Sequence, residues 1–441
     1  MFARLAMPAV ALVVIGAFVV SEMAVRKDFD DGKVHITYWE KWTGIEFAAI
    51  KAVVDDYNAS QDRIHVDLLS VSGIHNKTLM ATAAGVPPDV AGLFGPNVAQ
   101  YFHDRAVIPL DAMCAEAGIV REDYIPIYWD ICTFEDVLYA LPLTPASTAL
   151  HYNTRLFKQA GLSEPPRTIE EMDDYVARLT KLGADGRITQ AGFMHQEPGW
   201  WNWGWGFVFG GELWDGESKI TCDSPDNVRA FKWVQSYAKE YGASRMQTFR
   251  SGFGAFASPQ NAFMDEKVAM VLQGGWMGNF IAQFRPELQW AAAPFPYPSD
   301  KPELEGRTFA DLDILVIPRG AKHPKEAFEF ITYMQSQKAM EKLCLLQTKH
   351  SPLAQASPSF YANHPNPYIR LFTDMPKNDS VVSPPKIAIW PEYSSELRNA
   401  FDQVFVEGKD PQEVLTRVRL RMQPALDRYL KEKRLREEAG E

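Results

Sequence analysis

Strand patterns and helix patterns alternate along this chain, and this alternation limits its possible folds more than any other feature. Apolar and polar residues alternate over 34–39, which predicts a half-buried strand. Thr43 and Glu46 have the spacing of a capping box, and apolar residues then recur at helical period from Phe47 to Tyr57. A second strand is predicted over 64–69. Strand, helix and strand in this order form a βαβ unit, and such units build parallel sheets.

The alternation continues toward the C-terminus, so the predicted fold class is α/β. We expect a further strand over 90–94 and helices over 77–84, 98–103, 168–182, 225–241, 324–334 and 411–430. Prolines are concentrated in 294–302 and 352–391, which indicates connecting loops. The charged segment 431–441 is expected to be a frayed end.

The length of the chain predicts more than one folding unit. Its 441 residues exceed the usual size of a domain with a single core, so we expect two lobes. No stretch rich in Gly and Ser separates them. The lobes are therefore expected to be joined by several chain crossings rather than by one tether.

The first residues have the pattern of an export signal. Arg4 precedes an apolar run from Met7 to Val20, which is short for a transmembrane helix. Two interpretations of segment 1–27 remain open: a signal peptide that is cleaved near Ser21 or Ala24, or an uncleaved signal anchor that tethers the protein to the cytoplasmic membrane. A third interpretation is that the segment forms a buried core helix. The first two place the protein in the periplasm or outside the cell.

Charge narrows the classes of partner. The formal net charge is −11, whereas proteins that bind nucleic acid broadly need a basic surface. The same charge opposes electrostatic docking to anionic lipid. We therefore expect no nucleic-acid partner.

The residues that most often bind metals show no metal spacing. The nine histidines are scattered, and the four cysteines form no CxxC motif, so no metal site is predicted. In an oxidising compartment Cys114 and Cys132 could form a local disulfide. The alternative is that both are buried free thiols.

Tryptophan is the clearest compositional signal for a ligand. Five of the twelve tryptophans lie between 200 and 214. Indole faces suit the apolar C–H faces of sugar rings, and the indole N–H can donate to a hydroxyl. We expect Trp201, Asn202 and Trp203 to contact a carbohydrate. The alternative is that about half of these rings only fill space between a loop and a helix.

Two further segments place tryptophan where a strand ends. Residues 39–42, Trp-Glu-Lys-Trp, lie between a predicted strand and a predicted helix, and ligands bind at such strand ends in open α/β sheets. Trp276 follows the apolar run 268–272 and two glycines. We expect Trp39, Glu40, Trp42 and Trp276 to bind ligand. The alternatives are an aromatic wedge that shields the sheet edge and an indole that only packs.

Motifs of known enzyme classes are not found in the sequence. It contains no Gly-x-Ser-x-Gly, no Walker phosphate loop and no His-Glu-x-x-His. Asp311 and Asp313 are expected on one face of a strand, where a glycosidase pair remains an alternative to a hydrogen-bonding or structural role. We predict a protein without catalytic residues or cofactors.

Four groups of residues resemble the motifs of a known family. They are the Ala-Gly-x-x-Pro-Asp-Val element at 84–90, the stretch from Tyr139 to Thr168, Ala262–Met270 and Leu315–Ile331. Through them, residues 33–430 resemble the family 1 extracellular solute-binding proteins, a sugar-binding group that includes the maltodextrin-binding proteins.

The resemblance implies a type II periplasmic-binding-protein fold with a ligand cleft between two lobes. One lobe would comprise 28–143 and 294–352, and the other 144–293 and 353–430. The resemblance adds further ligand contacts from matching loops: Asn97, Trp390 and Tyr393. Some relatives carry an acid after the Leu-Pro pair, whereas this chain has hydroxyls there. The hydroxyls of Thr144 and Ser147 are therefore expected to contact the ligand in place of that acid. Asp311 is expected to be a further polar ligand contact.

The implied function is capture of a mono- or oligosaccharide and its delivery, by lobe closure, to the permease subunits of an ABC importer. The protein would act as a monomer. Two alternatives remain: a tethered sugar sensor that docks to a receptor, and a carbohydrate-active hydrolase or lyase. The hydrolase predicts turnover that depends on Asp311 or Glu40.

Overall fold

A computed structural model describes residues 31–254 and 258–439. The segment 1–27, expected to be a signal peptide or anchor, lies outside the described residues. Within the described ranges, no helix has the length and the apolar character needed to cross a bilayer.

One part of the main sheet is built by the N-terminal strands. β1 (Val34–Glu40) pairs in parallel with β2 (Ile64–Ser70) and β3 (Val90–Phe94), and α2 (Gly44–Ser60) connects the first two. The predicted βαβ unit is confirmed. The predicted capping box is wrong, because the side chain of Thr43 makes no capping hydrogen bond. The end of β1 lies beside the middle of β3, since Glu40 is the register partner of Gly92.

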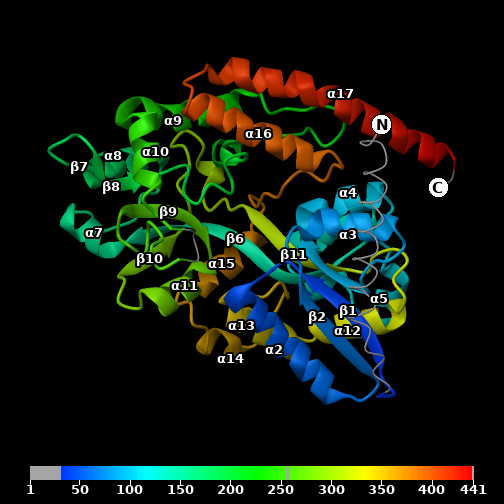
Figure 1. Ribbon diagram of the computed structural model, residues 1–441. Coiled ribbons are helices and arrows are strands. Elements are labelled where there is room, and N and C mark those ends of the chain that lie inside the picture. Colours follow the sequence, from blue (N-terminus) through cyan, green and yellow to red (C-terminus); the bar gives the residue numbers. More distant parts are fainter. Residues whose placement is uncertain (1–30, 255–257, 440–441) are drawn as a thin grey trace, which may run out of the picture.

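A single long strand joins this part of the sheet to the rest. Residues 141–147 of β6 (Leu141–Asn153) pair with β11 (Ala310–Val316), which also pairs with β3. Residues 148–152 pair instead with β9 (Val268–Gly274). Figure 1 shows β6 crossing the middle of the molecule, with β1 and β2 on one side and β9 and β10 (Trp290–Ala293) on the other. We call the two sides the β1 half and the β9 half.

The remaining strands are short or lie at the edge of the sheet. In the β9 half, β9 pairs in parallel with β8 (Ile188–Phe193), which pairs with β7 (Lys181–Leu182). A separate two-stranded sheet contains β4 (Thr133–Phe134) and β5 (Val137–Leu138).

The helices surround these sheets. They are α3 (Ile74–Ala83), α4 (Val98–His103), α5 (Asp111–Ala117), α6 (Pro126–Cys132), α7 (Thr154–Gln159), α8 (Ile169–Leu179), α9 (Pro225–Tyr241), α10 (Ala243–Arg250), α11 (Met277–Phe284), α12 (Pro324–Gln335), α13 (Gln337–Gln347), α14 (Pro358–Ala362), α15 (Ile369–Asp374), α16 (Trp390–Phe405) and α17 (Pro411–Glu438). The predicted strand at 90–94 and the six predicted helices are all present, with small differences at their ends except in the last helix. The limits predicted for the two lobes stay a prediction.

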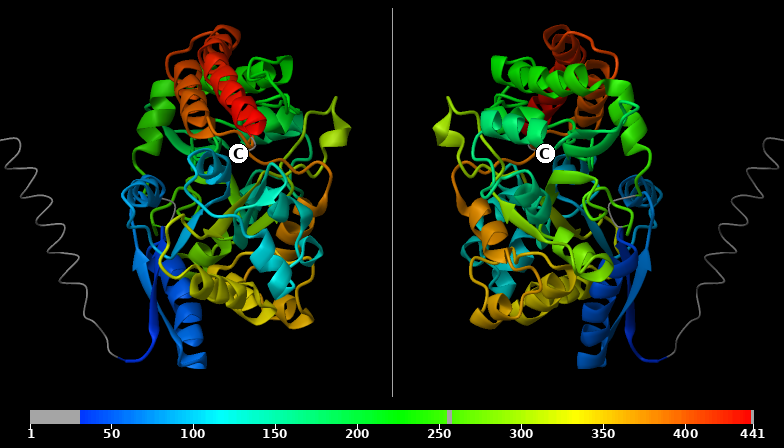
Figure 2. Two further views of the ribbon diagram at one scale, coloured as in Figure 1. Left: turned by 90° about the vertical axis from the view of Figure 1, so that its right-hand side faces the viewer. Right: turned by 90° about the vertical axis from the view of Figure 1, so that its left-hand side faces the viewer.

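The last helix is longer than the sequence pattern indicates. The expected end near Leu430 and the frayed tail are wrong, because α17 continues to Glu438. Its extension is anchored by an ion pair from Lys433 to Glu135 at 2.9 Å and by a hydrogen bond from Arg436 to the carbonyl of His103 at 3.1 Å. Both views in Figure 2 show α17 beside α16 at one end of the molecule.

The four cysteines are buried free thiols. Of the two alternatives for Cys114 and Cys132, the structure therefore shows the unpaired one. Burial raises the pKa of the Cys114 thiol to about 12, so this thiol is protonated and unreactive near neutral pH.

Candidate ligand-binding site

The site begins at the end of β1, where the sheet accommodates a buried acid. The side chain of Glu40 is fully buried and accepts hydrogen bonds from the Tyr38 hydroxyl at 2.5 Å and from the backbone N–H of Lys41 at 2.8 Å. The neighbouring strand makes room for it with Gly92. A Cβ atom at this position would lie 2.0 Å from Oε2 of Glu40.

Asp313, on β11, is the centre of the polar contacts. One carboxylate oxygen lies 3.2 Å from Nζ of Lys41, and the other lies 2.9 Å from Nζ of Lys349. The second oxygen also accepts from the Thr144 hydroxyl at 2.7 Å and from the indole N–H of Trp42 at 3.2 Å. We call Glu40, Lys41, Thr144, Asp313 and Lys349 the lysine–aspartate cluster.

The charges of this cluster balance one another. Burial alone would raise the pKa of Asp313, but the ammonium groups of Lys349 and Lys41 outweigh burial and hold it at about 2. Burial alone would lower the pKa of Lys41, but Asp313 and Glu40 outweigh it and raise that pKa. Asp313 and Lys41 are therefore held as an ion pair, and the formal charges of the two acids and two lysines in the cluster sum to zero.

Lys349 lies between indole rings from the two halves. Its Nζ is 5.2 Å from the ring centroid of Trp42 and 5.9 Å from that of Trp276. It follows Thr348, whose left-handed φ of 57° ends α13. Ammonium groups at such distances are attracted to the electron-rich faces of indole rings. The Trp42 loop follows β1 and Trp276 follows β9, so this lysine contacts both halves.

The turn after β9 fixes the position of the Trp276 ring. A Cβ atom at Gly274 would lie 2.1 Å from a carbon of this indole, so only glycine leaves room for the ring. The side chain of Trp276 is nearly buried, with 8% of its surface exposed.

Aromatic rings extend from Trp276 into the tryptophan-rich loop. Its ring centroid lies 6.1 Å from that of Trp200 and 6.3 Å from that of Trp201. Phe309 then contacts Trp201 at 6.2 Å and Trp203 at 5.1 Å between centroids. These five rings pack mainly on one another, and they do not form an open floor in this arrangement of the halves.

A cavity of about 520 Å³ opens beside this loop. Trp200, Asn202, Gln196 and the ion pair between Arg250 and Glu197 contribute to its lining. Within the described part of the chain, Oδ1 of Asn202 and Oε1 of Gln196 are buried acceptors without a hydrogen-bond partner. Buried acceptors are stabilised by a donor, and the hydroxyl group of a ligand is one such donor.

The structure brings together four of the residues proposed from the sequence. Glu40 and Thr144 belong to the lysine–aspartate cluster, and Trp42 and Trp276 lie on either side of Lys349. Thr144 lies beside an acid from another strand, because its hydroxyl donates to Asp313 on β11.

Trp201, Asn202 and Trp203 form a second group in the tryptophan-rich loop. Asn202 lines the cavity, whereas Trp201 and Trp203 are 9% and 8% exposed and lie within the ring packing. Trp390 extends that packing, since its ring lies 4.8 Å from Trp203 between centroids. Tyr393 is fully buried next to Trp390, and its hydroxyl donates to the Leu213 carbonyl.

The other proposed residues lie apart from the lysine–aspartate cluster. Trp39 alternates with Tyr38 and Glu40 along β1, so it is on the opposite face, half-buried against the core. Asn97 is half-buried at the start of α4. Ser147 is buried and donates to the carbonyl of Phe372.

Asp311 has a different environment from Asp313. It lines a cavity of about 10 Å³ together with Gly95 and Ile131, and its carboxylate accepts the N–H of Leu312 at 2.7 Å. The pairing of β11 with β6 is irregular between Leu312 and Ile314. Burial raises the pKa of Asp311 to about 7.

Sequence reasoning missed the two charged residues at the centre of the site. The sequence suggests for Asp313 a place in a glycosidase pair or a hydrogen-bonding or structural role, but no ligand contact, and it suggests no role for Lys349. Nothing in the local pattern around Lys349 distinguishes it from a surface lysine, because its partners come from β1, β6 and β11. Trp200 and Phe309 were missed as links between Trp276 and the rest of the loop.

Comparisons with known proteins agree with this architecture. Residues 41–341 match the family described as "Bacterial extracellular solute-binding protein". A solved structure of CpMnBP1 with mannotriose bound is 26% identical, has a TM-score of 0.80, and the match covers 88% of this chain and 99% of that one. The sugar-binding protein MalE of Xanthomonas citri has a TM-score of 0.73 at 20% identity, with 90% of this chain and 98% of that one covered.

A curated sequence relative carries a related name. The multiple sugar-binding protein of Streptococcus mutans is 23% identical over 332 residues, which are 71% of this chain and 73% of that protein. The structural matches confirm the predicted two-lobe α/β fold.

Proposed function

This chain belongs to the family of bacterial extracellular solute-binding proteins, and we propose that it binds a neutral oligosaccharide outside the cytoplasm and delivers it to an ABC importer. The observation that carries the proposal is the position of Lys349. Its ammonium group lies on indole faces from both halves and contacts Asp313 and Thr144.

The lysine–aspartate cluster, with the indole rings of Trp42 and Trp276 beside it, suits a sugar better than other small ligands. A sugar ring has C–H faces that stack on indoles and hydroxyl groups that both donate and accept. Trp42 and Trp276 offer the faces, while Lys349 donates and Asp313 accepts. The balanced charges of the lysine–aspartate cluster favour a neutral ligand. The relatives named for sugars support this choice, and CpMnBP1 makes mannobiose and mannotriose the first ligands to test.

Binding would proceed through movement of the halves. The two halves are in contact through Lys349, which lies near Trp42 and Trp276, and through the packed aromatic rings. A ligand would therefore enter after the halves separate. A ligand that contacts both halves binds the closed arrangement better and shifts the equilibrium toward it. The closed surface would then be recognised by the permease subunits. We infer that the protein is exported, acts as a monomer, and is either released or tethered through segment 1–27.

The direct test is a titration of the full-length chain with mannobiose, mannotriose, maltotriose and a sugar phosphate. Intrinsic tryptophan emission reports binding, and small-angle scattering reports the radius of gyration. We expect saturable binding of a neutral oligosaccharide with a smaller radius at saturation. Preference for the sugar phosphate, or binding without compaction, would contradict the proposal.

We propose that the protein is a binding protein and not a hydrolase. Asp311 and Asp313, the acid pair of the hydrolase alternative, have different environments, because Asp313 is paired with Lys41 and Lys349. Glu40 is held by Tyr38 and Lys41, and Asp311 lines a cavity with room for about one water molecule. Incubation with the bound oligosaccharide followed by chromatography should return it intact. Shorter products that disappear in an Asp311→Asn variant would instead support the hydrolase.

A further inference from the structure

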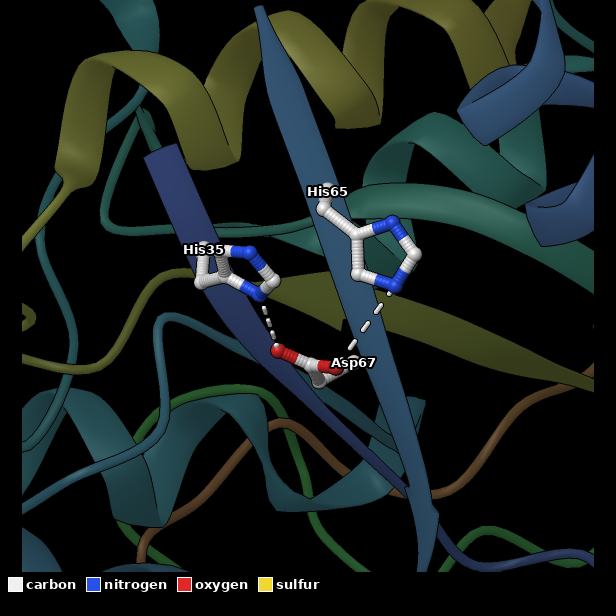
Figure 3. A group of neighbouring side chains, drawn as sticks. All are labelled: His35, His65 and Asp67. Atoms are coloured by element: carbon white, nitrogen blue, oxygen red, sulfur yellow. Dashed lines mark hydrogen bonds and ion pairs between the residues drawn. The ribbon is translucent and has the colours of Figure 1, made fainter. Parts of the chain in front are cut away.

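Two histidines and an aspartate gather on the sheet far from the proposed sugar site. His35 on β1 is the register partner of His65 on β2, and Asp67 follows two residues later on the same face of β2. The ring centroids of the two histidines are 5.0 Å apart. Figure 3 shows both rings directed at the carboxylate of Asp67.

The distances between the polar atoms are those of a metal site. Nδ1 of His35 lies 3.0 Å from one carboxylate oxygen of Asp67, and Nε2 of His65 lies 3.7 Å from the other. One ligand atom from each residue lies within 4.8 Å of the other two. Ligand atoms at ~2.0–2.1 Å from a tetrahedral zinc ion are about 3.3–3.4 Å apart. Small side-chain rotations therefore suffice, and the side chains are 25%, 38% and 43% exposed, so they have room to move.

A second carboxylate orients the first histidine. Oδ2 of Asp31 lies 3.2 Å from Nε2 of His35, on the side of the ring opposite to Nδ1. A carboxylate that accepts the outer N–H of an imidazole fixes its tautomer and makes the other nitrogen a better metal ligand. Asp31 is thus placed to keep the N–H of His35 on Nε2, so that the Nδ1 lone pair can bind a cation beside Asp67.

The electrostatic surroundings favour a cation. The carboxylates of Asp67 and Asp31 both lie within hydrogen-bond distance of the His35 ring, at 3.0 Å and 3.2 Å. The same two carboxylates would stabilise a divalent ion. Among the described residues, the ion pairs of Asp67 are with His35 and His65, so no lysine or arginine already neutralises it there.

We propose that His35, His65 and Asp67 bind one zinc-type divalent cation, with Asp31 as the hydrogen-bonding support of His35. Two imidazoles and a carboxylate are a ligand set for zinc, and water completes the tetrahedron. The ion would connect β1 to β2. His35 lies five residues before Glu40 on β1, about 16 Å away along the strand, so metal binding does not require sugar binding.

The test uses the full-length chain without a polyhistidine tag, stripped with EDTA and titrated with ZnCl₂ at pH 7.5 by calorimetry. Co²⁺ serves as the spectroscopic probe, because a tetrahedral Co²⁺ site absorbs strongly in the visible range. We expect one Zn²⁺ per chain. His65→Gln and Asp67→Asn should each weaken affinity more than about 100-fold, and Asp31→Asn about 10–100-fold.

Two variants serve as matched controls. His323→Gln removes a half-buried imidazole outside the site, and Asp62→Asn removes an exposed carboxylate near the start of β2. Neither should change the zinc affinity. All variants should retain oligosaccharide binding. The proposal is overturned if zinc does not saturate at one equivalent, or if His65→Gln and Asp67→Asn bind zinc as the unmodified chain does.

Discussion

The indole N–H of Trp42 donates to a carboxylate oxygen of Asp313 at 3.2 Å, across 271 positions of the sequence. The same oxygen contacts Lys349, whose ammonium lies over the Trp42 ring. One aspartate thus holds both the ring and the cation on which the proposed sugar site depends.

Asp313→Ala should strongly destabilise the protein. It leaves the buried ammonium groups of Lys41 and Lys349 without their shared partner, and breaking a buried ion pair costs about 3–5 kcal/mol. Urea unfolding followed by circular dichroism measures the change in the free energy of unfolding. The control is Asp55→Asn, which breaks an exposed pair with Lys51 and should cost about 0.5 kcal/mol or less. Equal effects of the two changes would contradict the role given to Asp313.

Trp42→Leu should weaken binding of the preferred oligosaccharide by at least about tenfold, or ~1.4 kcal/mol, because stacking and the indole N–H are both lost. Trp42→Phe keeps a ring face and should lose less. Calorimetry gives both dissociation constants. Trp129→Phe, in a half-buried tryptophan outside the site, is the control. Unchanged affinity in Trp42→Leu would remove Trp42 from the site.

Stability should fall as pH rises from about 4 to 7 because of Asp311. Its pKa is about 7 in the folded chain, against ~3.9 in an unfolded one. Between these values the folded state holds the proton that the unfolded state has released, so each pH unit costs up to about 1.4 kcal/mol. Other groups add their own slopes, so the readout is the difference from Asp311→Asn. This variant should gain stability relative to the unmodified chain between pH 5 and pH 8. A constant difference across that range would show that Asp311 titrates normally.

Gly92→Ala should damage the site through the sheet. The added methyl group would lie 2.0 Å from the Glu40 carboxylate, and overpacking of this kind costs about 1–3 kcal/mol. Oligosaccharide affinity should fall with it, since Glu40 holds Lys41. Gly252→Ala is the matched control, because its nearest neighbour is 3.4 Å away and its φ is not positive. Thermal unfolding and calorimetry on both variants distinguish a local effect from a general cost of replacing glycine.

The local parts of the fold could be predicted from the sequence. Periodicity is a short-range signal, so the βαβ unit from 34 to 69 and the helix after Pro324 agree with the structure. The end of α17 could not be predicted, because its last turns depend on Glu135 and on the His103 carbonyl, which come from elsewhere in the chain.

The candidate ligand-binding site could likewise be predicted only in part. Glu40, Trp42 and Trp276 follow strands, and strand ends are where α/β sheets place ligand contacts. Lys349 follows a helix and becomes central only because three strands bring its partners to it. The proximity of His35 and His65 could not be predicted for a related reason. Thirty positions separate them in the sequence, and only the parallel register of β1 and β2 places them side by side.

The long strand β6 belongs to both halves of the molecule. Hydrogen bonds hold it to β11 up to Ser147 and to β9 from Thr148 onward, so its two ends are clamped to different bodies. If the β1 half and the β9 half rotate relative to each other, the backbone dihedral angles of β6 near Ser147 and Thr148 must change. Thr144 lies three residues from Ser147 and contacts Asp313 and Lys349. The backbone change would therefore occur close to the proposed sugar site. Ligand contact and rotation of the halves would therefore be coupled at the point where β6 passes from β11 to β9.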